Sequence, residues 1–95
     1  MDSIRPKKRF GQNFLIDQSA VDSIIDLIRP RKEDNILEIG PGTGVMTERL
    51  LKSGATVYAV EIDRELCALL SDKYQNPTNF FLYQCDFLKF DLRKL

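Results

Sequence analysis

A turn with three glycines in five positions is the most distinctive feature of this chain. It reads Glu38-Ile39-Gly40-Pro41-Gly42-Thr43-Gly44 and lies between a short apolar run and a predicted helix. Glycine adopts backbone angles that other residues avoid, and it lets a ligand approach the main chain closely. The first N–H groups of a helix are unpaired and stand at the positive end of its dipole. We therefore predict a turn that binds a carboxylate or another polar ligand group.

Two acids, Glu61 and Asp86, stand at the ends of predicted strands downstream of this turn. Glu61 follows the turn by about twenty residues, where an acid can accept hydrogen bonds from ribose hydroxyls. A carboxylate at Asp86 can accept a hydrogen bond from an adenine amino group, and the neighbouring Ile62 and Phe87 could sandwich the adenine ring. Since the carboxyl ends of parallel strands share one edge, these residues predict a nucleoside site there.

The spacing of the glycines separates two classes of ligand. A dinucleotide-binding turn reads G-x-G-x-x-G, but Val45 occupies the place of its third glycine here. The order G-x-G-x-G, preceded by the acid Glu38, resembles the turn of methyltransferases instead. Their methyl donor, S-adenosylmethionine, has no phosphate, so the turn need only hold an amino-acid end and a ribose.

Each of these features also has a purely structural interpretation. The glycines could make only a tight turn, although three in five positions exceed what packing requires. Glu61 and Asp86 could be ordinary helix-cap or surface acids, as most acids are. We favour a binding function because both acids fall at successive strand ends, at the edge where the glycine turn lies.

Helical and strand patterns alternate along the chain. Asp17 and Asp63 are good N-caps for the first and third predicted helices, and a second helix is expected from about Val45 to Lys52. The predicted strands, rich in apolar residues, are Asn35–Ile39, Thr56–Glu61 and Phe80–Gln84. This alternation predicts an α/β fold with a parallel sheet of about three strands flanked by helices.

Apolar periodicity predicts which faces of the helices point inward. The residues expected to face the core are Val21, Ile24, Ile25 and Ile28 in the first helix, Met46, Leu50 and Leu51 in the second, and Leu66, Leu69 and Leu70 in the third.

The composition is that of one small domain. Its 95 residues include 14 basic and 14 acidic side chains, so net charge makes no case for a nucleic-acid partner.

With no histidine and two isolated cysteines, Cys67 and Cys85, we expect no metal site and two reduced thiols in the core. Because no apolar run could cross a bilayer and no signal peptide is evident, we expect a cytoplasmic protein without a membrane partner.

The segment before the first predicted helix is polar and basic, with neither helical nor strand periodicity. Its sequence, Lys7-Lys8-Arg9-Phe10-Gly11-Gln12-Asn13-Phe14-Leu15-Ile16-Asp17, closely resembles the opening signature of the rRNA adenine dimethyltransferases, and of their bacterial small-subunit group in particular. The glycine turn, Glu61 and Asp86 follow in that family's order. The resemblance covers essentially the whole chain. It implies a basic arm over residues 1–16 and, over residues 17–95, part of a Rossmann-like class I methyltransferase domain that binds S-adenosylmethionine.

The motifs and the resemblance together predict a cofactor site and an RNA contact, although Asn13 and Leu15 are assigned by the resemblance alone. The expected cofactor-binding residues are Asn13, Leu15, Gly40, Gly42, Glu61, Ile62 and Asp86. The basic cluster expected to contact RNA phosphates consists of Arg5, Lys7, Lys8 and Arg9. The implied reaction converts two adjacent adenosines near the 3′ end of small-subunit rRNA, in the immature small ribosomal subunit, to N6,N6-dimethyladenosine.

One departure from the family's pattern limits this prediction. The family's acceptor motif, an Asn-Leu-Pro-Tyr type sequence on a fourth strand, and its helical C-terminal domain are expected only after Leu95, so we assign no catalytic residue and expect the chain alone to be inactive. Without that fourth strand, residues 35–39 would form an apolar edge open to self-association. Two alternatives stay open: a non-catalytic RNA-binding module and a nicotinamide-dinucleotide-binding domain.

Overall fold

The computed structural model describes residues 17–75 and 78–95. Helices and strands alternate within these ranges, as the sequence predicts. The elements are α1 (Gln18–Ile28), β1 (Asn35–Ile39), α2 (Val45–Lys52), β2 (Thr56–Glu61), α3 (Arg64–Lys73), β3 (Phe80–Gln84) and the single-turn 3-10 helices η2 (Phe87–Lys89) and η3 (Leu92–Lys94). All three predicted strands and the predicted second helix are confirmed at their boundaries.

The strands form one parallel sheet in the order β1-β2-β3. The central strand β2 ends level with both neighbours, since Val60 pairs with Ile39 of β1 and Glu61 pairs with Gln84 of β3. The carboxyl ends of the strands therefore meet at one edge of the sheet. The glycine turn follows β1 at this edge, and Asp86 follows β3.

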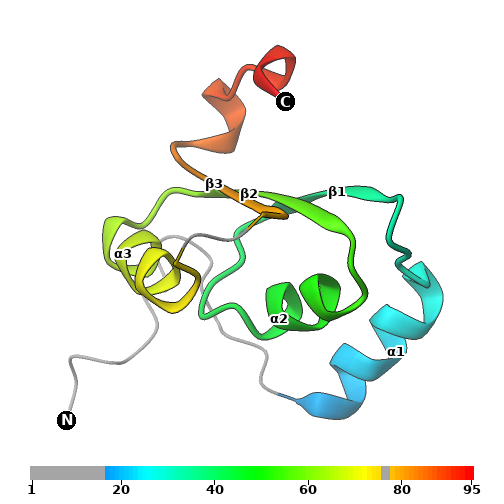
Figure 1. Cartoon of the computed structure of the whole chain (residues 1–95). Coiled ribbons are helices and arrows are strands. Elements are labelled where there is room, and N and C mark those ends of the chain that lie inside the picture. The colour runs from blue at the N-terminus through cyan, green and yellow to red at the C-terminus, as the bar shows by residue number, and fades with distance from the viewer. Residues whose placement is uncertain (1–16, 76–77) are drawn as a thin grey trace, which may run out of the picture.

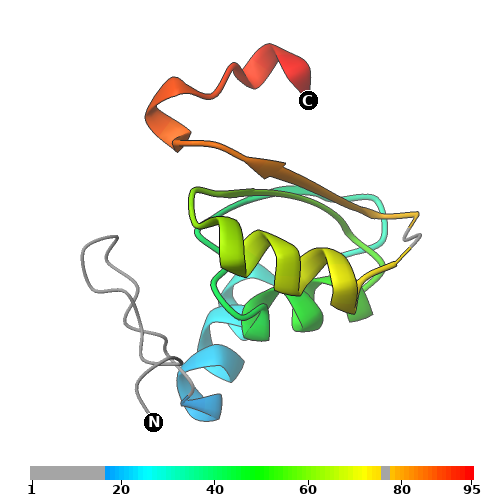
Figure 2. The same cartoon turned by 90° about the vertical axis from the view of Figure 1, so that its left-hand side faces the viewer.

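The three α-helices all lie on one face of the sheet, while η2 and η3 lie on the other (Figures 1 and 2). The hydrophobic core fills the space between the sheet and the helices. Its buried cluster consists of Leu50 from α2, Val57 and Ala59 from β2, and Phe80 from β3. Helix α1 packs against α2, on the side of the fold where β1 lies (Figure 1).

Asp17 and Asp63 cap the starts of α1 and α3, as the sequence predicts. The Asp17 side chain accepts a hydrogen bond from the Ser19 N–H at 2.9 Å, and Asp63 accepts from the N–H groups of Glu65 and Leu66 at 2.8 and 3.1 Å. Each carboxylate satisfies amides that a helix start leaves unpaired. Helix α2 differs, because its N-cap is Gly44, which has no side chain to offer.

The inward faces of two helices are narrower than the periodicity predicted. In α3, Leu70 is fully buried but Leu69 is 49% exposed. In α1, Val21 is buried and Ile25 packs on the core, whereas Ile24 and Ile28 are exposed. The predicted core positions of Leu69, Ile24 and Ile28 were therefore wrong. In the described part of the chain the sheet has three strands, so it covers only part of the apolar surface of each outer helix.

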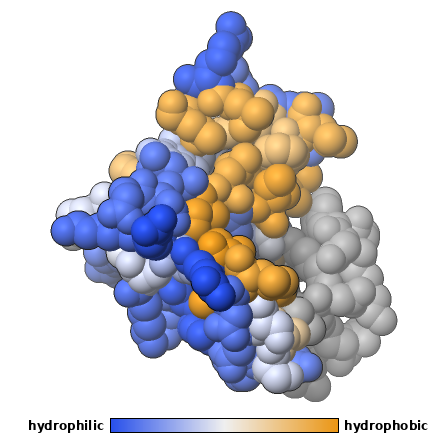
Figure 3. Space-filling model, turned by 90° about the vertical axis from the view of Figure 1, so that its right-hand side faces the viewer, coloured by the Kyte–Doolittle hydropathy of each residue, from blue (hydrophilic) through white to orange (hydrophobic). Residues whose placement is uncertain are grey.

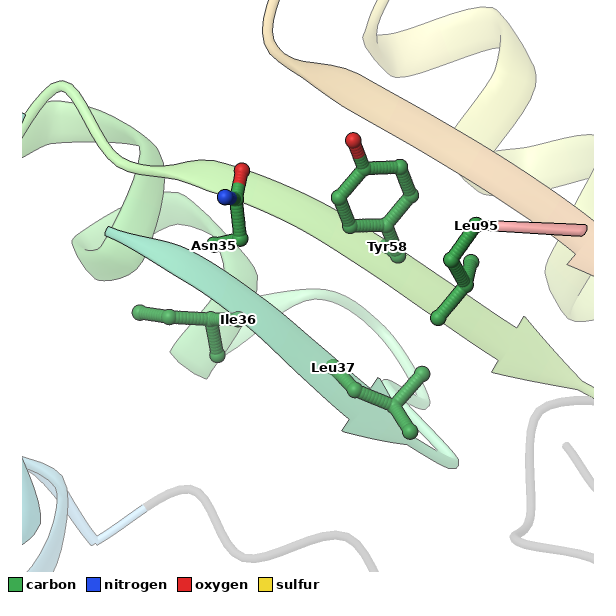
Figure 4. A pocket seen from close by; sticks show the side chains of 5 residues that line it. All are labelled: Asn35, Ile36, Leu37, Tyr58 and Leu95. Carbon is green, nitrogen blue, oxygen red and sulfur yellow. The ribbon is translucent and has the colours of Figure 1, made fainter. Parts of the chain in front are cut away.

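The face of the sheet opposite the α-helices carries aromatic side chains. Tyr58 of β2 and Phe81 of β3 are stacked with ring centroids 5.2 Å apart, and Tyr83 tilts against Phe90 at 5.1 Å. A pocket on the β1 side is lined by Asn35, Ile36, Leu37, Tyr58 and Leu95 (Figure 4). The space-filling view from that side shows a large apolar surface (Figure 3).

Candidate functional site

The glycine turn adopts the left-handed geometry that its sequence predicts. Gly40, Gly42 and Gly44 have φ values of 68°, 61° and 91°. A Cβ added to Gly40 would meet nothing within 4 Å, so the main chain borders open space there. At Gly44 the reason for glycine is packing as well, because a Cβ would lie 2.8 Å from Leu70 Cδ2. Among the described residues, Gly40 therefore combines a positive φ with room for a ligand.

Glu61 joins the glycine turn to the start of α3. It is 2% exposed, and its Oε1 accepts a hydrogen bond from the Gly42 N–H at 3.2 Å. Its Oε2 accepts from the Asp63 N–H at 3.0 Å. A carboxylate oxygen can accept two hydrogen bonds, so these backbone bonds are compatible with ribose hydroxyls as further donors. The structure thus adds to the predicted ribose contact a role that sequence reasoning missed, which is to hold the turn in place.

Glu38 is a second acid beneath the turn that the sequence analysis noted without a role. Its Oε1 accepts a hydrogen bond of 2.5 Å from the hydroxyl of Thr47, which is 0% exposed in the first turns of α2. Burial raises the pKa of Glu38; the Thr47 hydrogen bond opposes this shift, and the charge of Glu61 adds to it. Strand alternation was the available signal, because Glu38 lies two residues after Ile36 and therefore shares the core-facing side of β1.

The remaining predicted residues of the sheet edge lie where the sequence placed them. Asp86 directly follows Cys85, whose N–H donates to the Glu61 carbonyl at 3.0 Å, so both acids stand at the same edge. The half-buried Asp86 also caps η2 by accepting from the Leu88 N–H at 3.0 Å. Ile62 is exposed and Phe87 is half-buried, which leaves surface on both for a flat ring.

The two thiols are free, and Cys67 is buried as predicted, whereas Cys85 is only half-buried. Cys67 Sγ donates to the Glu61 carbonyl at 3.4 Å. Burial, reinforced by the charges of Glu61 and Asp63, raises the pKa of Cys67 to about 11. A thiol with such a pKa stays protonated and unreactive at neutral pH, so its role is packing.

The predicted contacts on the arm lie outside the described residues. These are the donor contacts Asn13 and Leu15 and the basic cluster of Arg5, Lys7, Lys8 and Arg9. Within the described ranges, no group of three metal-binding side chains is found. No helix in those ranges is long and apolar enough to span a membrane.

Comparison with known proteins assigns the family. The model of the ribosomal RNA adenine dimethylase family matches residues 4–95, which is nearly the whole chain. The chain belongs to the ribosomal RNA adenine dimethylase family. The glycine turn, Glu61 and Asp86 all lie within the matched residues.

Bacterial proteins are among the curated relatives of this dimethylase family member. It is 51% identical over 89 residues to the ribosomal RNA small subunit methyltransferase A of Hahella chejuensis, covering 94% of this chain and 33% of that protein. The protein of the same name from Methylococcus capsulatus is 43% identical over 90 residues, covering 95% and 35%. The chain spans about a third of the length of the curated relatives it matches.

Solved structures place the dimethylase chain among the Rossmann-like class I methyltransferases. The 23S rRNA methyltransferase ErmE matches with a TM-score of 0.73 and 32% identity, covering 83% of this chain and 32% of that chain. A dimethyladenosine transferase from Plasmodium falciparum matches with a TM-score of 0.76 and 28% identity, covering 84% and 30%. The predicted fold class is confirmed.

Proposed function

We propose that this chain is the S-adenosylmethionine-binding portion of an rRNA adenine N6,N6-dimethyltransferase. The proposed substrate is a pair of adjacent adenosines near the 3′ end of small-subunit rRNA, in the cytoplasm. The observation that carries the proposal is the hydrogen bond from Gly42 to Glu61, because it joins the glycine turn and the strand-end acid into one site.

The shape and chemistry of the described site fit the methyl donor. The open space at Gly40 allows the amino-acid end to approach the main chain at the start of α2. Glu61 is proposed to accept from the ribose hydroxyls and Asp86 from the adenine amino group, with Ile62 beside the ring. The proposed site also includes Gly42 in the turn and, on the arm, Asn13 and Leu15.

When bound, S-adenosylmethionine supplies an electrophilic methyl group. The described residues orient that group by fixing the two ends of the donor, at the turn and at the strand-end acids, and such orientation is a large part of a transfer rate. An adenine amino group is a poor nucleophile, because its lone pair is delocalised into the ring. No Asn-Leu-Pro-Tyr type sequence that would orient it occurs in the 95 residues. We therefore propose that this chain binds the donor but does not methylate RNA by itself.

Titration calorimetry with S-adenosylmethionine and with its demethylated product tests the proposal. We expect binding to the wild-type chain and a loss of at least tenfold in affinity for Glu61→Ala. Glu33→Ala is the matched control, because Glu33 is an exposed acid remote from the sheet edge. Equal affinities in Glu61→Ala and the wild type would refute the site, and tighter binding of NADH would favour a dinucleotide-binding domain.

The basic arm is proposed to contact rRNA phosphates. Arg5, Lys7, Lys8 and Arg9 carry the charge that such a contact needs. A salt series of binding to an rRNA hairpin tests this, because each lost phosphate contact lowers the slope of log K against log salt by about one. An unchanged slope after all four are replaced by alanine would exclude the arm as the contact.

A further inference from the structure

Two carboxylates are neighbours beneath the glycine turn. Glu38 of β1 pairs in register with Ala59 of β2, and Glu61 follows Ala59 by two residues on β2. Alternate residues of a strand share a face, so Glu61 projects on the same side of the sheet as Ala59, which belongs to the core beneath the helices. Glu38 projects there too, because its Oε1 accepts from the hydroxyl of Thr47 in α2 at 2.5 Å. The two acids are therefore diagonal neighbours on adjacent strands.

The arrangement around Glu38 favours its neutral form. The hydrogen bond that it accepts comes from a hydroxyl, which brings no positive charge. A like charge and partial burial both make the ionised form of a carboxyl group less favourable. Since Oε1 already accepts the hydrogen of Thr47, Oε2 is the oxygen that can hold a proton while this bond is kept. A protonated Glu38 also removes the repulsion between the two acids.

The groups that face Glu38 come from three elements in the described part of the chain. Thr47 faces it from α2 and does not titrate. Burial raises the pKa of Glu38; the Thr47 hydrogen bond opposes this shift, and the charge of Glu61 from β2 adds to it. Tyr74, directly after α3, is near enough to be influenced by Glu38. Burial raises the pKa of the Tyr74 phenol, so it stays neutral at neutral pH and supplies no charge.

We propose that Glu38 is a proton-exchanging residue of the donor site, which holds a proton while the site is empty and releases it when S-adenosylmethionine binds. The inference rests on the proposed function. In the release step the O–H bond at Oε2 breaks, its electron pair stays on the oxygen and the proton passes to the solvent. No bond of the donor changes.

The charge of the donor supplies the reason for this release. S-adenosylmethionine carries an ammonium and a sulfonium group against one carboxylate, so it brings a net positive charge into the site. Its amino-acid end is proposed to lie at Gly40, which follows Glu38 by two residues and borders open space. A positive charge near a carboxyl group favours the ionised form. Thr47 then acts as a positioning residue, because its hydroxyl still donates to the carboxylate that remains.

Titration calorimetry in buffers of different ionisation enthalpy counts the protons released for each donor bound. We expect the wild-type chain to release up to one proton, and fewer as the pH rises above the raised pKa of Glu38. Below that pKa the affinity should fall by up to about tenfold for each pH unit, because the donor must displace the proton. Glu38→Gln cannot release this proton and should lose the effect. Glu33→Gln is the matched control, because Glu33 is an exposed acid remote from the site.

A second pair of variants tests the proposal even if Glu38→Gln fails to bind the donor. Thr47→Val removes the hydrogen bond to the ionised Glu38, so the release should extend to higher pH, whereas Thr47→Ser should keep the wild-type profile. Far-UV circular dichroism confirms that each variant is folded before it is compared. Identical profiles for Thr47→Val and the wild type would overturn the proposal, and so would an undiminished release in a Glu38→Gln chain that binds the donor.

The wild-type chain separates this inference from the proposed function. Donor binding without proton release at every pH between pH 5 and pH 7 would overturn the role of Glu38 and leave the donor site in place. A folded chain that binds no S-adenosylmethionine would refute the proposed function, and this inference with it.

Discussion

The N–H of Gly42 donates to the carboxylate of Glu61 at 3.2 Å, across 19 residues of sequence. The same carboxylate accepts from the Asp63 N–H, so one side chain fixes both the glycine turn and the first turn of α3. Both connections are buried, where an unpaired acceptor or donor is costly. The residue expected to bind a ribose is therefore also a structural joint, and substitutions there change stability as well as binding.

Replacing Glu61 by glutamine separates these two roles. An amide has one acceptor oxygen where the carboxylate has two, so one of the N–H groups of Gly42 and Asp63 would lose its partner. We expect Glu61→Gln to lower the free energy of unfolding by about 1–3 kcal/mol. Denaturant unfolding measures this. Glu33→Gln is the control, because Glu33 is exposed and its replacement should cost no more than about 0.5 kcal/mol. Equal stability in both variants would show that the hydrogen bonds of Glu61 with Gly42 and Asp63 do not stabilise the fold.

The hydrogen bond from Thr47 to Glu38 should be worth more when Glu38 is ionised. Thr47→Val keeps the shape but leaves a buried carboxylate without its donor, at a cost of about 1–3 kcal/mol at pH 7. Thr47→Ser keeps the hydroxyl and loses one methyl group, at a cost of about 1 kcal/mol. We expect the cost of valine to shrink as the pH falls through the raised pKa of Glu38, while the cost of serine stays constant. A valine variant with no pH dependence would show that Glu38 does not use this donor as an anion.

The raised pKa of Glu38 predicts how stability varies with pH. Because burial raises the pKa in the folded chain above its ordinary value of 4.5, the folded state binds the proton more tightly than the unfolded state. The resulting stabilisation is fully present below pH 4.5 and is lost as the pH rises through the folded pKa. Asp17, Glu48 and Asp91 have lowered pKa values, so their contributions are lost in the opposite direction, as the pH falls through their folded pKa values.

The test compares wild type with Glu38→Gln between pH 5 and pH 7, above the ordinary values of those other acids. We expect the stability of the wild type, relative to the variant, to decrease as the pH rises. Urea unfolding at several pH values gives the difference directly. Parallel curves for the two proteins would mean that the Glu38 pKa is not raised.

Much of the fold could be predicted from local signals, and the misses have a common physical cause. Strand bounds and the caps Asp17 and Asp63 depend on neighbouring residues, and both were correct. Exposure of Ile24 and Leu69 depends on how far the sheet extends, which helical periodicity does not encode. The bond from Gly42 to Glu61 joins residues 19 apart, and only the assembled sheet edge brings them together. Sequence could therefore place Glu61 and the glycine turn at one edge of the sheet but could not predict the hydrogen bond that joins them.

The arm contacts follow from resemblance alone and have their own test. If Asn13 and Leu15 bind the methyl donor, saturating S-adenosylmethionine should protect the amides of residues 13–15 from hydrogen exchange. The reference is the same chain carrying Glu61→Ala, at a donor concentration that leaves it unbound. Equal exchange with and without the donor, in a wild-type chain shown to bind it, would remove these two residues from the site while Gly40, Glu61 and Asp86 could still stand.

Alanine substitutions at the glycines can separate effects on stability from effects on ligand binding. Gly40 and Gly54 both have positive φ, 68° and 89°, and neither has a neighbour that a Cβ would approach closer than 3.4 Å. Gly40→Ala and Gly54→Ala should each cost about 1–2 kcal/mol, the strain of a left-handed alanine. Gly44→Ala adds a 2.8 Å clash with the buried Leu70, so it should cost about 2–4 kcal/mol.

Gly40→Ala and Gly54→Ala should have similar stability but different affinities for S-adenosylmethionine. A methyl group on Gly40 would enter the space proposed for the amino-acid end of the donor, whereas Gly54 lies beside Lys32, after α2, away from the sheet edge. We expect Gly40→Ala to weaken S-adenosylmethionine binding at least tenfold and Gly54→Ala to leave it unchanged in calorimetry. Because the two variants carry the same backbone strain, a difference between them reports on the ligand alone. Equal binding by both would mean that the donor does not approach the main chain at Gly40.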